Sequence, residues 1–530
     1  MNNKGKIFTG IYLFLLLSGL AGMALVFASA MLYGPGISHD SVAYMHASKS
    51  LLQGNGFEYF GYPSPFIQWP PLLPLLLAGA GFLGIEPADA SVWINAIAHG
   101  MIIFFSGAYF FSRLKSKLSA AFGTLLLVFS APLLMVSRFI WTETLFVLFY
   151  LLFFINLEKY YNGGNVKHLV LAGIFSALAC LDRYAGVTII FAASLVLILR
   201  KCKPAKIFRD IVFYGAVSAS PLAAWIARNY LVSSTLMGVR LPSEYSVGVN
   251  IKRIISSIYT WIQPDAKLTV VMSPVTAGGA RFFAVLVPAA ILAAYAVLLI
   301  NGFIKHGHNR VKPGESPAAD LHHFKVLFNA AFSIIYLAYL LASASIIAFE
   351  PINSRYLIPV YLPAVFIFIA AADAIAGRVE MQPGSFPVFR RIAVAVLGLY
   401  LVYPAVNMVS SAARLMQDGA GGYSTRTWHD NELIKYMRTS PRDCTYYSNN
   451  ADVIYAITGV RAFYPPKKSG PYMYGVEQFK KALDSDKCSY IIWFKNGVPE
   501  TLFDIEDIAN LYELEIIEQN DAGKVYRVIR

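Results

Sequence analysis

Residues 34–71 read GPGISHDSVAYMHASKSLLQGNGFEYFGYPSPFIQWPP, a polar and aromatic stretch that directly follows an apolar run over about residues 7–33. The run is long enough to cross a membrane, because a spanning helix needs about 20 apolar residues. Asp40 therefore lies a few residues beyond the end of a membrane helix. A carboxylate is costly to maintain beside apolar helices, so this stretch indicates a functional site.

The composition is that of an integral membrane protein. Of 530 residues, 57% are hydrophobic and only 14% are charged, whereas about 25% are charged in a typical soluble domain. The apolar runs are long and unbroken, which favours membrane helices over a β-barrel. The formal net charge is +13. The lysines and arginines of the chain cluster between the apolar runs. They therefore indicate how the protein is oriented in the membrane, and no nucleic-acid partner is predicted.

The apolar runs predict about eleven membrane helices, counting the first. Residues 71–84 are apolar but too short to span, so we expect an interfacial helix there. The remaining predicted spans cover residues 91–112, 118–136, 140–157, 168–181, 184–199, 211–230, 281–303, 326–348, 357–376 and 392–411.

Loop charges predict the orientation of these helices. With the N-terminus in the cytoplasm, the cytoplasmic segments carry clusters of lysine and arginine, as the positive-inside rule expects. These are Arg113/Lys115/Lys117, Lys159/Lys167, Arg200/Lys201/Lys203/Lys206/Arg209, Lys305/Arg310/Lys312/Lys325 and Arg378/Arg390/Arg391. The short outer loops hold one cation each: Lys49, Arg138, Arg183 and Arg355. Eleven spans then put the C-terminus outside, on the same side as Asp40.

From about residue 412 the composition changes to that of a small α/β domain. We expect an amphipathic helix at 428–438 and strands at 444–448, 488–494, 513–517 and 524–529, the last two as a candidate hairpin. Cys444 and Cys488 both lie in this domain. A disulfide and two free thiols are both open readings, because sequence does not supply the geometry.

Three short outer loops repeat one theme, a charged residue held between apolar helices. They are SRFIWTE at 137–143, DRYAG at 182–186 and EPINSRY at 350–356. Their guanidinium groups suit a phosphate, and their carboxylates suit a general base or a metal. In the alternative reading, local pairs only fix the loops, Asp182 with Arg183 or a neighbour and Glu350 with Arg355.

The motifs in these loops resemble those of one enzyme superfamily. The first outer loop contains His39-Asp40-Ser41-x-x-Tyr44, then Gly54-x-Gly56-Phe57 and Trp69-Pro70-Pro71-Leu72 before an interfacial helix. This pattern resembles the GT-C glycosyltransferases, and among them the bacterial members related to protein O-mannosyltransferases and aminoarabinose transferases. Further matching motifs are Thr142-Glu143, Arg355-Tyr356-Leu357-x-Pro359 and, in the C-terminal domain, Tyr447-Ser448-Asn449-Asn450.

The resemblance implies a transferase that uses a sugar on a polyprenyl phosphate at the outer face of the membrane. Asp40 matches the family's catalytic acid and would take the proton of an acceptor hydroxyl, which attacks the anomeric carbon with inversion. Arg355, Arg183 and Lys49 are the candidates for binding the donor phosphate. Family members commonly begin this loop with Asp-Glu, whereas Ser41 follows Asp40 here. A second carboxylate would have to come from elsewhere, and Glu143 is the candidate.

Several roles stay open at this point. Glu143 could bind a metal, pair with Arg138 or orient the acceptor. A metal is not favoured and no cofactor is required, because a hard cation wants more oxygen ligands than Asp40 and Glu143 offer. Tyr44, one turn beyond Asp40, and Tyr356 are candidate supporting residues.

No histidine is assigned a catalytic or metal-binding role in the predicted site. His39 is expected to be a surface or hydrogen-bonded histidine more often than a second base. A separate group of histidines lies in one cytoplasmic loop without fixed ligand spacing, so no metal site is predicted there. It comprises His306, His308, His322 and His323.

The apolar runs predict an α-helical polytopic membrane protein, and the resemblance implies that it is of GT-C type. Two domains are expected: a transmembrane glycosyltransferase domain over 1–411 and an extracytoplasmic α/β domain over 412–530. Its expected partners are a polyprenyl-phosphate sugar donor, membrane lipids and a glycan, lipid or protein acceptor, in a bacterial inner membrane. The alternative is a transporter or lipid-linked-sugar flippase. Against it, the charges lie at the ends of spans and the sequence shows no matching pair of interrupted half-helices.

Overall fold

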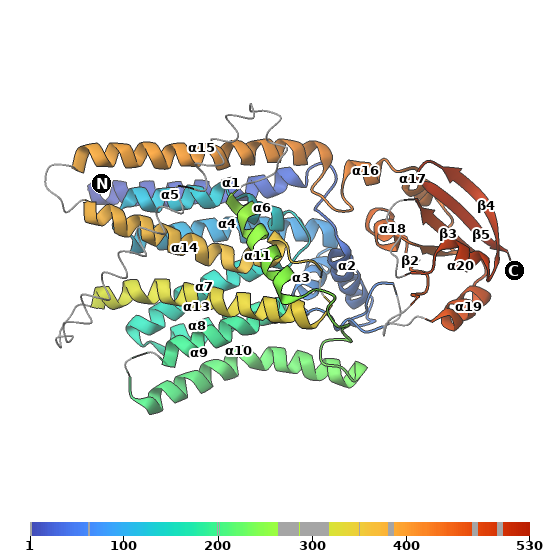
Figure 1. The fold of residues 1–530 in the computed structure, drawn as a ribbon, viewed down its shortest axis with the longest axis horizontal. Coiled ribbons are helices and arrows are strands. Elements are labelled where there is room, and N and C mark those ends of the chain that lie inside the picture. Colours follow the sequence, from blue (N-terminus) through green and yellow to red (C-terminus); the bar gives the residue numbers. More distant parts are fainter. Residues whose placement is uncertain are drawn as a thin grey trace.

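The computed structural model describes residues 3–61, 64–198, 200, 202–262, 286, 317–348, 350–379, 386–468, 475–495 and 502–529. A bundle of long helices makes up most of the described chain, and a smaller α/β domain caps one end of it (Figure 1). The N-terminus lies at the opposite end of the bundle from this C-terminal domain. The short helices α2 and α3 occupy the end of the bundle that faces it.

The helices of the bundle follow the apolar runs. Their bounds are α1 Asn3–Ser29, α2 His39–Leu52, α3 Leu72–Gly81, α4 Pro87–Arg113, α5 Lys117–Val128, α6 Ala131–Ser137, α7 Glu143–Gly163, α8 Val166–Asp182, α9 Val187–Ile198, α10 Pro204–Ser233, α11 Val247–Ile262, α13 Pro317–Ile346, α14 Ser354–Val379 and α15 Phe386–Asp418. A 3₁₀ turn, η1 Tyr184–Gly186, precedes α9.

The chain is a polytopic helical membrane protein. Seven of the described helices (α1, α4, α7, α10, α13, α14 and α15) are long and apolar enough to span a membrane, and the α5–α6 pair adds an eighth if it is one span bent by 43°. α8 and α9, with 17 and 12 residues, coincide with two further predicted spans. Apart from residue 286, the predicted span at 281–303 lies outside the described residues, so the count of eleven stays a prediction.

Two helical segments differ from the expected ones. The run at 118–136 is divided because the Ser130 side chain caps α6 and Pro132 occupies its first turn. α15 continues to Asp418, beyond the predicted domain boundary at residue 411. The short apolar helix expected at 71–84 is present as α3. His306 and His308 lie outside the described residues, and His322 and His323 lie within α13.

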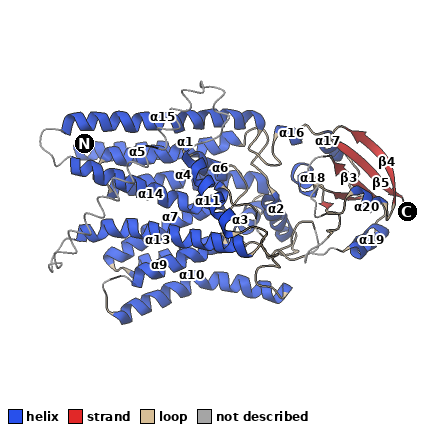
Figure 2. Cartoon of the chain, viewed as in Figure 1, coloured by secondary structure: helices blue, strands red, loops and turns tan. Residues whose placement is uncertain are grey.

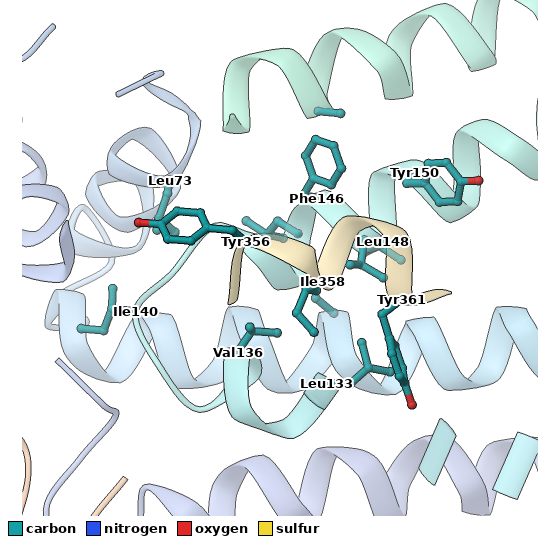
Figure 3. Packing of buried hydrophobic residues seen from close by; sticks show 14 of the residues in the cluster. Leu73, Leu133, Val136, Ile140, Phe146, Leu148, Tyr150, Tyr356, Ile358 and Tyr361 are labelled. Carbon is teal, nitrogen blue, oxygen red and sulfur yellow. The ribbon is translucent and has the colours of Figure 1, made fainter. Parts of the chain in front are cut away.

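The core between α6, α7 and α14 positions the start of two of these helices. Figure 3 shows Leu133 and Val136 of α6 beside Ile358 and Tyr361 of α14, with Phe146 and other side chains of α7 completing the cluster. These side chains are nearly fully buried. Burial of such aliphatic and aromatic groups stabilises the packing of helices, so the first turns of α7 and α14 are held next to each other.

The C-terminal domain contains all five strands of the described chain (Figure 2). They are β1 Thr445–Ser448, β2 Ala462–Phe463, β3 Ser489–Phe494, β4 Glu513–Asn520 and β5 Gly523–Ile529, in the sheet order β2-β1-β3-β5-β4. β1 pairs in parallel with β2 and β3, and β5 pairs antiparallel with β3 and β4. The predicted strands and the β4–β5 hairpin are therefore present.

Helices complete this domain: α16 Arg426–His429, α17 Glu432–Thr439, α18 Ala451–Thr458, α19 Val476–Ser485 and α20 Ile505–Ala509. The single helix expected at 428–438 is divided into α16 and α17, because the Asn431 side chain accepts the backbone N–H groups of Leu433 and Ile434 and starts a new helix. Cys444 and Cys488 form a disulfide next to the starts of β1 and β3.

The segment before α2 joins the two domains. Gly36 makes backbone hydrogen bonds with Arg138 (2.8 Å) and Ile140 (3.0 Å), and Ile37 accepts one from Tyr423 (2.8 Å). Gly422 has a φ of +61°, and a Cβ there would lie 2.0 Å from the Ile37 oxygen. Only glycine fits this close approach. The start of α2 is thus held between the 138–140 loop and the beginning of the C-terminal domain.

Candidate active site

Asp40 occupies the first turn of α2, at the junction of the two domains. Ser38 caps this helix, and the Ser38 backbone N–H donates to Ser41 Oγ at 3.0 Å. Ser41 Oγ in turn donates to the Ile140 carbonyl at 3.1 Å. Ser41 is fully buried, so the residue that replaces a second acid serves here to attach α2 to the 138–142 loop. The carboxylate of Asp40 is favoured in the first turn by the helix dipole.

Arg355, at the start of α14, connects Asp40 to a second carboxylate. Its Nη2 donates to Asp40 Oδ2 at 2.6 Å, and its Nε donates to Glu143 Oε1 at 2.6 Å. The guanidinium also lies over the Trp141 ring, 4.0 Å from the ring centroid. The planar fork of arginine allows this double use, since its donors point at both acids while its face stacks on the indole.

Glu143, the first residue of α7, is fully buried and contacts two guanidiniums. Besides Arg355, the Nη1 atom of Arg183 donates to Glu143 Oε1 and, at 3.0 Å, to Thr142 Oγ1. Asp40, Arg355, Glu143 and Arg183 therefore form one continuous line of ion pairs, which we call the carboxylate–arginine chain. Two anions balance two cations, as burial of charge requires.

The exposed end of this chain is Asp40. Its side chain is 22% exposed, whereas the carboxylate of Glu143 is 0% exposed. Burial raises the pKa of Asp40, but Arg355, His39 and Arg183 lower it by more, so the net pKa lies below the ordinary value of an aspartate. Asp40 is therefore ionised at neutral pH and can accept a proton from a hydroxyl group that reaches it.

His39 links the site to the C-terminal domain. Its Nδ1 lies 2.6 Å from Asp452 Oδ2, and its Nε2 lies 2.9 Å from the Tyr59 hydroxyl. Asp452 is in the first turn of α18 and is almost completely buried. Sequence reasoning missed Asp452, which lies two residues beyond the Tyr447–Asn450 motif. Only the tertiary packing of α18 against α2 brings it to His39.

The other predicted site residues are not members of the carboxylate–arginine chain. Lys49, in the last turn of α2, pairs with the exposed Glu86 at 3.1 Å and is not brought into the carboxylate–arginine chain. Tyr44 is buried on α2 against Phe66 and Trp69. Tyr356 follows Arg355 in the sequence, and its hydroxyl donates to Glu350 at 2.6 Å.

The local ion pairs of the alternative reading do not form. Arg355 bonds to Asp40 and Glu143 while Glu350 bonds to Tyr356. Arg183 bonds to Glu143, whereas the buried oxygens of Asp182 have no hydrogen-bond partner among the described residues. The guanidiniums thus join separate helices, and they do more than fix their own loops.

No family model and no curated protein matches the sequence. Solved structures do match its fold. ArnT from Cupriavidus metallidurans in the apo state has a TM-score of 0.61 at 12% identity, over 96% of this chain and 97% of that one. The same ArnT bound to undecaprenyl phosphate gives 0.63 at 12% identity with the same coverage. The archaeal oligosaccharyltransferase AglB from Archaeoglobus fulgidus, in complex with an inhibitory peptide and a dolichol-phosphate, gives 0.47 at 14% identity, over 91% and 69%.

At 12% identity the match to ArnT shows a shared fold. It extends over almost the full length of both chains and includes the C-terminal domain. The chain therefore shares the fold of ArnT, in line with the resemblance of its loop motifs.

Proposed function

We propose that this protein transfers a sugar from a polyprenyl-phosphate donor to an acceptor hydroxyl at the outer face of the membrane. The observation that carries the proposal is an ionised, partly exposed Asp40 at the end of the buried carboxylate–arginine chain, between a membrane bundle and a domain that caps it. The shared fold supports it, because ArnT binds undecaprenyl phosphate.

In the proposed reaction Asp40 acts as the general base. Its carboxylate accepts the proton of the acceptor hydroxyl as the oxygen attacks the anomeric carbon of the donor sugar. The new C–O bond forms on the face opposite the leaving group, so the configuration inverts. The bond between the anomeric carbon and the phosphate oxygen breaks, and polyprenyl phosphate leaves with the electron pair. No strong general acid is needed, since the leaving phosphate carries its own charge.

Arg355 is the first candidate for contacting the donor phosphate. Two of its nitrogens, Nε and Nη2, are used by Glu143 and Asp40. Its Nη1 is the atom that we propose to donate to the phosphate, which gains negative charge as the sugar leaves. Arg183 is more distant from Asp40 in the carboxylate–arginine chain and is proposed as a supporting cation. Lys49 reaches a phosphate only after leaving Glu86.

Glu143 is proposed to supply the second carboxylate in a supporting role. Its position between Arg355 and Arg183 suits orientation of both guanidiniums, and burial keeps it from the acceptor. Tyr44 and Tyr356 are proposed as supports, for α2 and for the start of α14 respectively. The outer-face location follows from the loop charges, which predict a cytoplasmic N-terminus and an outer C-terminal domain in a bacterial inner membrane.

The test is transfer by purified, detergent-solubilised protein offered a panel of polyprenyl-phosphate sugars together with glycan, lipid and peptide acceptors. We expect a new glycosidic bond and release of polyprenyl phosphate, and we expect neither with Asp40→Asn at matched protein yield. Asp430→Asn, which removes an exposed ion pair with Arg426, is the control. A flippase makes no bond in detergent, so movement of lipid-linked sugar in vesicles without bond formation would favour the transporter instead.

A further inference from the structure

The pairing of His39 with Asp452 is not used by the mechanism above. Asp452 is 1% exposed, so its carboxylate requires a compensating cation or a proton. His39 lies at 2.6 Å, and its own side chain is 49% exposed. This ion pair crosses from the membrane bundle to the C-terminal domain.

His39 is charged at neutral pH in this arrangement. Burial lowers the pKa of His39, but the Asp452 carboxylate and then Asp40 raise it, to a net value of about 9. Lys467 opposes this shift. The neutral hydroxyl of Tyr59 faces the other ring nitrogen. An imidazolium therefore lies in the same helical turn as Asp40.

The docking of the C-terminal domain is fixed by a second contact on the same helices. Two turns beyond His39 on α2, His46 packs edge-on against Tyr455 of α18, with ring centroids 5.7 Å apart. Tyr455 also contacts Phe60 at 4.8 Å. Tyr455 follows Asp452 by about one helical turn, so one face of α18 meets one face of α2 at both positions.

We propose that Asp452 and His39 are positioning residues for Asp40: the C-terminal domain holds His39 as an imidazolium, and this charge keeps Asp40 ionised when the donor phosphate binds Arg355 and offsets its positive charge. The inference rests on the proposed function and extends it to the C-terminal domain. Asp40 is faced by three cations, Arg355, His39 and Arg183. A phosphate bound at Arg355 Nη1 weakens the effect of that guanidinium on Asp40, and burial then favours the protonated acid unless His39 stays charged.

This role predicts a specific effect of pH on turnover. In Asp452→Asn, His39 loses the main group that raises its pKa, and we expect burial and Lys467 to shift His39 toward the neutral form at pH 7. Asp40 in the donor complex then becomes protonated at higher pH than in the wild type. Each unit by which the pKa of Asp40 in the donor complex then exceeds 7 reduces the active fraction about tenfold at neutral pH. Raising the pH restores ionised Asp40, so kcat of the variant should rise toward that of the wild type above about pH 9.

An ion pair that only joins the two domains gives a different result. In that case the wild type should lose activity above about pH 9, as His39 deprotonates, and fall to the level of the variant. The direction of convergence therefore separates the two roles. His39→Gln should behave like Asp452→Asn, and the double variant should be no worse than either. Asp430→Asn is the matched control in the same domain.

The experiment is the pH profile of kcat for the full-length wild type, both single variants and the double variant. A variant-to-wild-type ratio that is the same at all pH values, or a wild type that falls to the variant, overturns the proposal. Melting temperature tests the pair independently of activity. The pair should stabilise the wild type over Asp452→Asn fully below about pH 6.5, and this difference should vanish above about pH 9. A constant difference contradicts a charged pair, whereas absence of transfer by the wild type rejects only the proposed function.

Discussion

Arg355 donates a 2.6 Å hydrogen bond to Asp40 across a sequence separation of 315 residues. The same guanidinium donates to Glu143, and the Trp141 ring covers its face. One residue of α14 thereby fixes the position of the partly exposed acid relative to the buried one. The geometry of the site depends on the shape of this side chain as well as on its charge.

Arg355→Lys should therefore fail despite keeping the charge. A lysine ammonium cannot bond to both carboxylates in the fixed fork geometry or stack on Trp141 in the same way. We expect a loss of about 10²–10³ in kcat, the range for removal of one oriented donor. Arg355→Gln should in addition destabilise the fold by about 3–5 kcal/mol, because it leaves buried Glu143 short of a partner. Transfer assays and thermal unfolding check both, and wild-type kcat in the lysine variant would contradict the role of the fork.

The low pKa of Asp40 predicts how the free enzyme responds to acid. Arg355 and His39 hold this pKa below the ordinary 3.8, despite burial. Asp40 stays ionised as the pH falls from 7 toward that value, and the carboxylate is lost only below it. We expect kcat/KM to be flat from about pH 7 to 5. A fall in kcat/KM centred well above pH 5, without unfolding, would argue against Asp40 as the base.

Much of the fold could be predicted because its signals are local. Apolar runs gave the membrane helices, alternation gave the strands, and the parity of the spans grouped Asp40, Glu143, Arg183 and Arg355 at one end of the bundle. To group two loops at one end, it is enough to know that an even number of membrane helices separates them. The roles of these residues in catalysis stay predictions.

The pairing within the site could not be predicted. Arg183 is next to Asp182 in sequence, yet it bonds to Glu143, because packing of α7 against α8 decides which carboxylate it meets. His39 has no local sign of a partner, since Asp452 belongs to another domain. The disulfide likewise needed the register of β1 on β3.

Ser41 tests whether the site lacks a second acid. Because Ser41 is buried and bonds to Ser38 and Ile140, a glutamate there would bury a charge at a position where no cation of the described part of the chain is hydrogen-bonded. Ser41→Glu should lower stability by several kcal/mol and should not raise activity. Ser41→Ala should cost only about 1 kcal/mol, the usual price of a lost cap. Chemical or thermal unfolding of both variants gives the answer, and a more active Ser41→Glu would show that a second acid was missing.

Reduction of the Cys444–Cys488 disulfide should weaken the C-terminal domain. The bond closes a loop with a sequence separation of 44, for which chain entropy predicts about 3–4 kcal/mol of stabilisation. We expect a lower melting temperature for Cys444→Ser and for the reduced wild type, and no further loss when the variant is reduced. Equal melting temperatures with and without reductant would indicate that the thiols are not bridged in solution.

Chelation of divalent metals should leave transfer unchanged. Glu143 is the only acid near Asp40 in the carboxylate–arginine chain, and it already contacts the guanidiniums of Arg183 and Arg355. A divalent cation at Glu143 would lie beside two fixed positive charges, and Asp40 alone offers too few oxygens for a hard cation. We therefore expect the same rate after treatment with EDTA and after adding Mg²⁺ or Mn²⁺. A rate that falls with EDTA and returns with one added metal would instead assign Asp40 or Glu143 as a metal ligand, and Glu143→Gln should then abolish the metal response.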